Sequence, residues 1–408
     1  MRFAAFGYRD FRLFQVARFL LTIGVQMQSV AVGWHVYEMT RRPVDLGYVG
    51  LVQFLPLVGL SLLAGHTADR FDRRRVLLVC HVVIALSALA LATLTALHVT
   101  SLVPMFAVLF VFGSVRAFIG PAAQSLVPFL VPSEELPSAV TLSSGVWQIA
   151  AIVGPAAGGL IYAAGGPLAV YITTAITTLA TFGATLLMHV DTGRAEKRGL
   201  SLATLFAGVG YVFRTKIILG TISLDLFAVL FGGAVALLPA FARDVLHASP
   251  MALGLLRSAP SIGAAVMAAT LSVFPLGRHA GAKMLVAVFV FGLATLVFAS
   301  ARSVGVAMGA LIVCGAADMV SVVVRSTVIQ LATPNEMRGR VSAVNLVFVG
   351  ASNELGEFES GLTAEWLGVT RAIALGGALT CAVVATWTVV FPSLRRIGRL
   401  EDVGVIAE

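Results

Sequence analysis

GHTADRFDRRR, the stretch from Gly65 to Arg75, places two acids and four arginines between two long apolar segments. Charged residues make up only 12% of the 408 residues, against about 25% in soluble domains. In so apolar a chain, a short arginine-rich run is typical of a tight turn between two membrane helices on the cytoplasmic side. The stretch therefore predicts a helical hairpin that crosses a membrane.

The composition of the whole chain indicates an all-α integral membrane protein. Hydrophobic residues make up 58% of it, which leaves too little polar surface for a water-soluble fold of this length. A spanning helix takes roughly 20 residues, so about twelve helices with short loops use up the chain. The apolar runs are longer than barrel strands and lack a period of two, which predicts helices. We expect one of these spans at residues 216–242.

The chain offers no cofactor or metal site. Cys80, Cys314 and Cys381 lie inside apolar runs without metal-ligand spacing, so we interpret them as packing residues. Neither a phosphate-binding loop nor a nucleophile elbow is present. An enzyme or an ATP-driven pump is therefore not expected, and an ion gradient is the expected energy source.

The distribution of basic residues predicts the orientation. With the expected spans, 20 of the 28 Lys and Arg residues fall on one side of the membrane and five on the other. The more basic side faces the cytoplasm, which places both termini there. The N-terminus lacks a signal-peptide cleavage site and is interpreted as a cytoplasmic lead-in helix. The net charge of +8 then reflects orientation, and we expect no nucleic-acid partner.

The chain divides near its middle and repeats itself. The longest polar connection begins at Asp191, which predicts an N-terminal six-helix bundle at 1–190, a cytoplasmic linker at 191–215 and a C-terminal six-helix bundle with a short tail at 216–408. A shift of 202 residues aligns Pro132 with Pro334, Glu134 with Glu336, Gly154 with Gly356, Gly159 with Gly361 and Gly166 with Gly368. A parallel repeat of two halves is a transporter architecture. The alternative is two independently similar helical hairpins.

Three motifs resemble the major facilitator superfamily. In the opening stretch, the signature-loop positions are filled by Gly65, Ala68, Asp69, Arg70, Arg73 and Arg74, whereas Thr67 and Asp72 depart from the pattern. RAFIG, with Arg116 and Gly120, resembles the motif of the superfamily's proton antiporters. GVWQIAAIVGPAAGG resembles the motif associated with its exporters, through Gly145, Gly154, Pro155, Gly158 and Gly159. Two segments of the second half are similar to the enterobactin-exporter-like branch. The resemblance implies twelve helices in two pseudo-symmetric bundles.

The resemblance also implies a gating role for the opening stretch. Asp69 is expected to face the positive end of a helix dipole from the other half. Arg70, Arg73 and Arg74 are expected to pair with acids or lipid phosphates, so that the stretch holds the cytoplasmic side shut in one state. The alternative is an arginine cluster that only sets the topology. In the exporter motif, the glycines and Pro155 favour a bent helix with close packing, either as a rocking surface or as ordinary helix packing.

Ionisable residues within the expected spans are candidates for proton coupling, since each costs roughly 2.5–3.5 kcal/mol to insert. Asp318 and Arg325 lie two helical turns apart, and the 202-residue shift places Asp318 opposite Arg116, which suggests an acid–base pair. Neighbouring carboxylates repel each other at low dielectric, so one of them is expected to take up a proton. The alternative is that some of the glutamates pair with Arg116, Arg257 or Arg325 and only hold helices together. The proposed set is Arg116, Asp225, Asp318, Arg325, Glu354 and Glu357.

Polar and aromatic residues within the spans suggest a substrate cavity. Amides and indoles can orient an amphipathic ligand, and the candidates are Gln26, Trp34, Trp147 and Gln148. The alternative is that they satisfy one another or lie at the membrane interface.

These observations predict a secondary active transporter in a bacterial inner membrane, with lipids around it. The expected function is export of a small amphipathic compound, a drug-like molecule or a siderophore, in exchange for protons by alternating access. An importer or uniporter of a metabolite is the alternative within the same fold. A membrane enzyme or a sensor is the alternative from another class, and the sequence shows neither a catalytic cluster nor room for a signalling domain.

Overall fold

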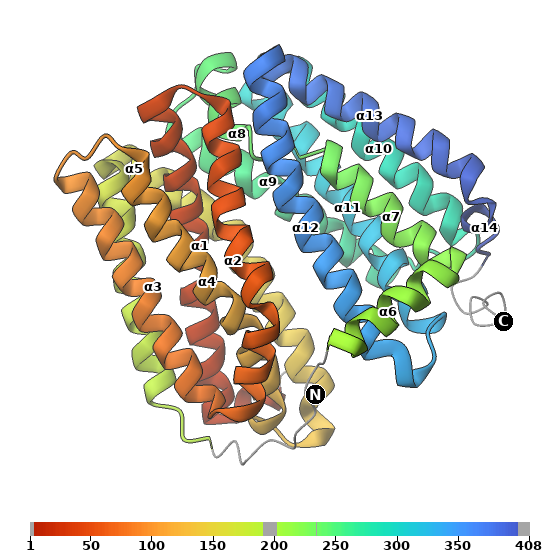
Figure 1. Ribbon diagram of the computed structural model, residues 1–408, viewed down its shortest axis with the longest axis horizontal. Helices are drawn as coiled ribbons and strands as arrows, with labels where there is room; N and C mark the ends of the chain where they lie inside the picture. The colour runs from red at the N-terminus through yellow and green to blue at the C-terminus, as the bar shows by residue number, and fades with distance from the viewer. Residues whose placement is uncertain (1–3, 191–201, 234, 399–408) are drawn as a thin grey trace. The chain divides into compact units, whose positions relative to one another are not determined.

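The computed structural model describes residues 4–190, 202–233 and 235–398, and within these ranges the backbone is helical without strands. Its long helices are α1 (Arg9–Thr40), α2 (Pro43–Arg70), α3 (Arg73–Ala96), α4 (Leu102–Leu126), α5 (Leu136–Leu186), α7 (Lys216–Phe231), α9 (Pro250–Val273), α10 (Ala280–Ser300), α11 (Val304–Leu331), α12 (Asn335–Leu367) and α13 (Val369–Val390). Shorter helices are α6 (Leu202–Arg214), α8 (Leu238–Ala240) and α14 (Pro392–Arg395). Figure 1 follows them along the chain.

Helix α5 is two helices joined at a bend. It has 51 residues, about twice the length needed to cross a bilayer, and Gly166 inside it has a φ of 67°. This left-handed conformation suits glycine, and Pro167 then starts the second arm. Counting both arms, the described ranges contain twelve long helical segments. Nine helices there are long and apolar enough to cross a membrane, which confirms the predicted all-α integral membrane class.

The prediction of one continuous span at 216–242 is wrong. Helix α7 stops at Phe231, and helical structure resumes only at Leu238 and passes into a π-helix at Phe241–Val245. The break falls at Gly232 and Gly233, and glycines carry the weakest helix propensity apart from proline. Gly232 also packs closely on α10, because a Cβ there would lie 2.6 Å from the Phe291 ring. The hydropathy of the sequence does not reveal this break, because glycine is neither strongly apolar nor strongly polar.

The chain forms two compact units. Unit 1 comprises residues 1–40, 52–200 and 249–258, and unit 2 comprises residues 41–51, 201–248 and 259–408. Helices α2 and α9 are therefore each divided between the units. Part of the predicted linker, Leu202–Arg214, is helix α6, and residues 191–201 lie outside the described ranges.

Backbone features match at several positions related by the predicted shift of 202 residues. Gly166 and Gly368 both have positive φ angles, 67° and 84°, and each is followed at once by a helical segment. Gly159 packs on the first turn of α9, and Gly361 packs on the first turn of α2. Those two turns carry the same pattern, Pro-x-x-Leu-Gly, at 43–47 and 250–254. Each half therefore uses the same small-residue crossing.

The turn inside the opening stretch is tight, as expected. Helix α2 continues to Arg70 and α3 begins at Arg73, so only Phe71 and Asp72 connect them. The Asp72 carboxylate accepts hydrogen bonds from the backbone N–H groups of Arg74 and Arg75, at 2.9 and 3.4 Å. An aspartate at this position satisfies the free N–H groups of the first turn. Asp72 therefore starts α3 directly, where the superfamily pattern has glycine.

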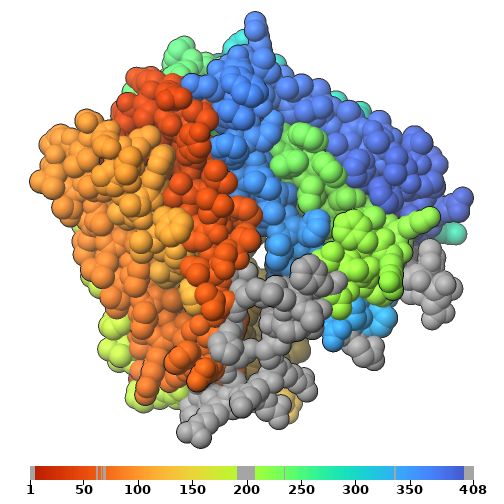
Figure 2. Space-filling model, in the orientation of Figure 1, coloured from red at the N-terminus to blue at the C-terminus, as the bar shows by residue number. Residues whose placement is uncertain are grey.

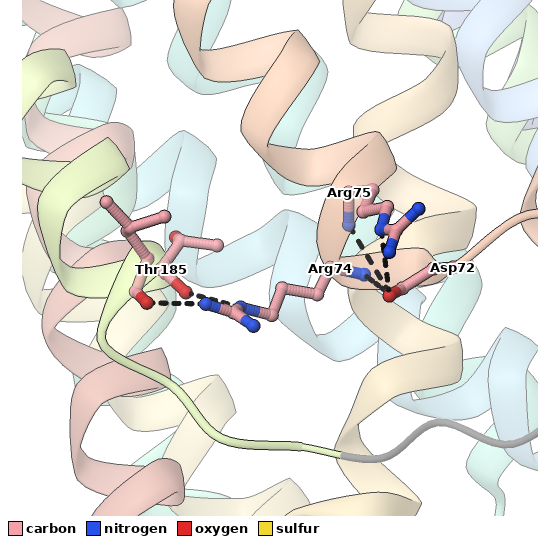
Figure 3. A network of polar contacts seen from close by, with 5 residues as sticks. Asp72, Arg74, Arg75 and Thr185 are labelled. Carbon is pink, nitrogen blue, oxygen red and sulfur yellow. Dashed lines mark hydrogen bonds and ion pairs between the residues drawn. The ribbon is translucent and has the colours of Figure 1, made fainter.

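Arg74 joins this turn to the end of α5. Its Nε donates to the carbonyl oxygen of Thr185 at 3.1 Å, and its Nη2 donates to that of Leu186 (Figure 3). These carbonyls belong to the last turn of α5, where the Thr185 carbonyl also accepts a hydrogen bond from the Met188 backbone N–H at 3.3 Å. A cation at a helix C-terminus is also favoured by the helix dipole. The contact ties α3 to α5 within unit 1.

Tight helix contacts build each unit. In unit 1, α1 packs along α5, and α3 packs against both α4 and α5. In unit 2, α10 packs against α11 and α13, and α7 packs against α12 and α13 (Figure 1). Side chains of α12 and α13 form a continuous blue surface in Figure 2. These two helices expose large apolar side chains, as expected where helices meet lipid acyl chains: Leu346, Val347, Trp366, Val389 and Val390.

We expect Asp72→Ala to destabilise the protein by about 0.5–2 kcal/mol, because α3 loses its N-terminal cap. Asp72→Asn should be close to wild type, because asparagine caps a helix as well as aspartate does. Thermal unfolding of the detergent-solubilised protein measures both. Equal unfolding temperatures for the alanine and asparagine variants would show that the cap contributes nothing.

We expect Gly159→Ala to destabilise unit 1 by about 1–3 kcal/mol through overpacking. The added Cβ would lie 2.5 Å from the Pro250 carbonyl oxygen and 2.9 Å from Gly254 Cα. Gly183→Ala is the matched control on the same helix, because a Cβ there meets nothing within 4 Å. The same unfolding assay applies, and a Gly159→Ala variant as stable as the control would contradict the close crossing.

Candidate functional site

Unit 1 contains a cavity of about 420 Å³. Helices α1, α3, α4 and α5 line it, and three residues predicted for binding or coupling are on its wall: Gln26, Arg116 and Trp147. The volume lies in the range of about 300–1,000 Å³ that is usual for small-molecule sites. The cavity is therefore the candidate substrate site of this unit.

The lining follows from helical spacing. On α1, Arg18, Thr22 and Gln26 lie four residues apart, so they share one face, as Arg116, Gly120 and Gln124 do on α4. Arg18, Gln124 and His81 were missed as site residues. Arg18 was counted only as a topological charge, although its spacing from Gln26 could have revealed it. His81 is buried, with Nδ1 3.5 Å from Thr185 Oγ1.

Arg116 of α4 contacts α2 within unit 1. Its Nη1 donates to the Gln53 carboxamide oxygen at 3.5 Å, and its guanidinium carbon lies 5.9 Å from the centre of the Phe112 ring. One turn earlier, Gly113 lets α4 approach α2, because a Cβ there would overlap the Gln53 backbone. The side chain is exposed and reaches the cavity.

Unit 2 contains a second, smaller cavity of about 180 Å³. Most of its wall is apolar, with Phe291, Phe298 and Leu311 among the lining residues. The acids Asp318 and Glu357 and the carboxamide of Asn353 interrupt this wall. Two acidic residues from different helices, α11 and α12, therefore line one mostly apolar cavity.

Asp225 and Arg325 form a buried ion pair between α7 and α11. Their side chains are only 5% and 7% exposed, so each charge depends on the other for neutralisation. Of the coupling candidates, the structure thus pairs these two. Asp318 lies two turns from Arg325 on α11 and lines the cavity instead.

Glu354 and Glu357 converge on the start of α2. A Cβ on Gly50 would lie 2.8 Å from Glu357 Oε2 and 3.2 Å from Glu354 Oε2. Gly50 belongs to unit 2, so the two glutamates meet a backbone surface of their own unit. Glu359 has a separate environment, since its Oε1 accepts a hydrogen bond from Thr363 Oγ1 at 2.7 Å.

The residues of the exporter motif pack α5 between two helices. A Cβ on Gly154 would lie 2.6 Å from Gln26 Cβ, and one on Gly158 would lie 2.7 Å from Met27 Cα, both on α1. Gly159 faces α9 instead, and the carbonyl of Pro155 lies against Gly254 there. Gly145 meets nothing within 4 Å. Four of the five predicted motif residues thus lie at helix crossings.

The residues predicted for gating differ in what they contact. Arg74 binds the end of α5, and the Arg73 guanidinium carbon lies 4.8 Å from the centre of the Phe129 ring. Arg70 is exposed and Gly65 lies within α2. The Asp69 side chain lies outside the described part of the structure, so its predicted contact with a helix terminus stays a prediction.

Two predicted cavity residues lie elsewhere. Trp34 is buried against Tyr162, with ring centres 6.4 Å apart, and Gln148 is not among the residues that line the unit 1 cavity. The predicted pairing of Arg116 with Asp318 stays a prediction, because the two belong to different units. Among the described residues, no group of three or more His, Cys, Asp or Glu could hold a metal ion.

Sequence comparison identifies relatives along the whole chain. Residues 1–399 match the family described as transmembrane secretion effector. The multidrug efflux pump Tap of Mycolicibacterium fortuitum is 26% identical over 380 residues, which cover 90% of this chain and 92% of that protein. The enterobactin exporter EntS of Citrobacter koseri is 26% identical over 336 residues, covering 82% and 80%.

Solved structures share the fold. The nucleoside transporter NupG superposes with a TM-score of 0.69 at 16% identity, covering 94% of this chain and 99% of that chain. A bacterial homologue of the iron transporter ferroportin, in an inward-facing state, gives 0.70 at 17% identity, covering 95% and 99%. These likenesses concern the fold alone and agree with two pseudo-symmetric six-helix bundles. The chain therefore belongs to the transmembrane secretion effector family of the major facilitator superfamily, whose members are multi-pass membrane transporters and not enzymes.

Proposed function

We propose that this transporter exports small amphipathic compounds, drug-like molecules or siderophores, in exchange for protons. Support for export comes from the two relatives, a multidrug efflux pump and an enterobactin exporter, which match most of the chain. We place the transporter in a bacterial cytoplasmic membrane with both termini in the cytoplasm, on the basis of its arginine distribution.

The observation that supports proton coupling best is the pair of acids in the unit 2 cavity. Asp318 and Glu357 lie among apolar side chains, where a charged carboxylate is costly. Proton uptake removes that cost, and proton release restores a charge inside the cavity. A proton on one of these acids therefore changes the electrostatics of unit 2, which is what a coupled transporter needs from its ion site.

The Asp225–Arg325 pair is less suited to carry the proton. Protonation of Asp225 would leave Arg325 as an unpaired buried cation, and breaking a buried pair costs about 3–5 kcal/mol. We assign this pair the role of holding α7 against α11. The cavity acids then remain as the proton carriers.

The glycine crossings support movement during the transport cycle. Backbone meets backbone where Gly159 lies on α9 and where Gly361 lies on α2, without interlocking side chains. Such smooth contacts favour small sliding of one helix along another. Alternating access then uses the same crossing once in each half of the repeat.

An efflux panel tests the function. We expect cells of an exporter-deficient bacterial host to accumulate less of at least one amphipathic dye or antibiotic when they express the protein. A protonophore should abolish this difference, because the gradient supplies the energy. Efflux that survives the protonophore would contradict proton coupling, and accumulation above the control would indicate the importer instead.

The coupling acids can be tested in proteoliposomes with the substrate that the panel identifies. We expect Glu357→Gln and Asp318→Asn each to lower transport driven by a pH gradient at least about tenfold, because a neutral amide takes up no proton. Glu359→Gln is the matched control on α12, since its carboxylate is held by Thr363. Counterflow without a pH gradient should continue in all three variants.

Two results would count against this assignment. Undiminished pH-driven transport in both cavity variants would remove these acids from the coupling mechanism. An equal loss in Glu359→Gln would show that any carboxylate on α12 matters, whether or not it reaches the cavity.

A further inference from the structure

The ionisable residues found on the wall of the unit 1 cavity are basic. Arg18 on α1, Arg116 on α4 and His81 on α3 reach it, and among the described residues no aspartate or glutamate lines it. The unit 2 cavity has the opposite character, since Asp318 and Glu357 line it and no basic residue does so in the described part of the chain. The two cavities are therefore matched to ligands of opposite charge.

The two arginines retain binding capacity on the cavity side. In the described ranges, Arg18 makes no ion pair with a carboxylate, and it is half-buried on α1. The hydrogen bond from Arg116 to Gln53 uses one of its five N–H groups and leaves its charge uncompensated. Guanidinium groups bind oxyanions with two parallel hydrogen bonds, which are strengthened by charge. A guest oxyanion would supply the missing opposite charge.

The rest of the wall suits the body of an organic molecule. Trp147 is 47% exposed, so its indole offers a face for stacking beside the cavity. Phe14, Leu21 and Ile84 add apolar surface. Gln26 and Gln124 add carboxamide groups that can donate to or accept from a polar substituent.

We propose that the unit 1 cavity is a subsite for organic anions, in which Arg18 and Arg116 bind a carboxylate or similar oxyanion while Trp147 stacks on an aromatic body. This deepens the proposed function, since it names the class of substrate that the exporter takes. Under this proposal the substrate and the proton bind at different places. The substrate anion binds in unit 1, and the acids of unit 2 carry the proton. The acids of unit 2 would repel such an anion, which restricts it to the basic cavity.

A matched set of ligands tests the subsite without any gradient. The purified full-length protein in detergent is titrated with 2-naphthoate, 2-naphthylmethylammonium and 2-naphthylmethanol by isothermal calorimetry. The three share one ring system and differ in charge. We expect 2-naphthoate to bind at least about tenfold more tightly than the ammonium compound, with the alcohol between them.

Variants assign the binding to the arginines. Arg18→Gln and Arg116→Gln should each weaken 2-naphthoate at least about tenfold and leave the alcohol unchanged. Unchanged affinity for 2-naphthylmethanol shows that the cavity has folded. Arg18→Lys keeps the positive charge, so it should retain part of the affinity for 2-naphthoate that Arg18→Gln loses. Arg371→Gln changes an exposed arginine of unit 2 that is not among the lining residues, and this control should bind as wild type does.

Three results would overturn the subsite: undetectable binding of 2-naphthoate, tighter binding of the ammonium compound, or wild-type naphthoate affinity in both glutamine variants. None of them bears on proton coupling, because the assay contains no gradient. Conversely, loss of protonophore-sensitive efflux would refute the proposed function and leave the calorimetric result standing.

Discussion

The need to neutralise buried charge is the constraint that places Asp225 of α7 opposite Arg325 of α11 in unit 2. A charge within an apolar protein interior has to be neutralised, and these two side chains, 5% and 7% exposed, have each other. The pair joins the middle of α7 to α11. Two turns earlier on α11, Asp318 then faces the apolar cavity that Glu357 reaches from α12. Of the six candidate coupling residues, two thus form the buried pair, and Asp318 and Glu357 line the cavity.

The two halves share a backbone plan and differ in chemistry. The positive φ angles at Gly166 and Gly368, the Pro-x-x-Leu-Gly turns and the glycine crossings recur in both halves. Arg116 and Asp318, however, occupy equivalent positions with opposite charge, each one turn beyond a glycine that packs on a neighbouring helix. A duplicated scaffold thus presents a basic cavity in one unit and an acidic cavity in the other. This division suits a transporter that exchanges an organic anion and protons at separate places.

The sequence predicted the fold well, because composition and helix length leave few options in a membrane. The repeat was also visible, since glycine and proline mark backbone positions that a side chain cannot replace. The sequence did not predict the helix break after Phe231, because hydropathy changes little at a glycine. The sequence did not predict the Asp225–Arg325 pair. Spacing along one helix shows which residues share a face, but it does not show which neighbouring helix that face contacts. Arg18 was read as a topological charge, and only the fold shows that it lines a cavity with Gln26. Asp72 turned out to cap α3, a role that its local sequence permits but does not single out.

The most direct test of the account is pH-driven transport by the double variant Asp225→Asn with Arg325→Gln, reconstituted in proteoliposomes. Removing both charges together leaves no unpaired ion in the interior, so the protein should fold, as buried pairs replaced as a whole often do. If the pair is structural and the cavity acids carry the proton, transport of the identified substrate should still follow the imposed pH gradient. A folded double variant that exchanges substrate by counterflow but ignores the pH gradient would contradict this, because the proton would then travel through Asp225 and Arg325 themselves.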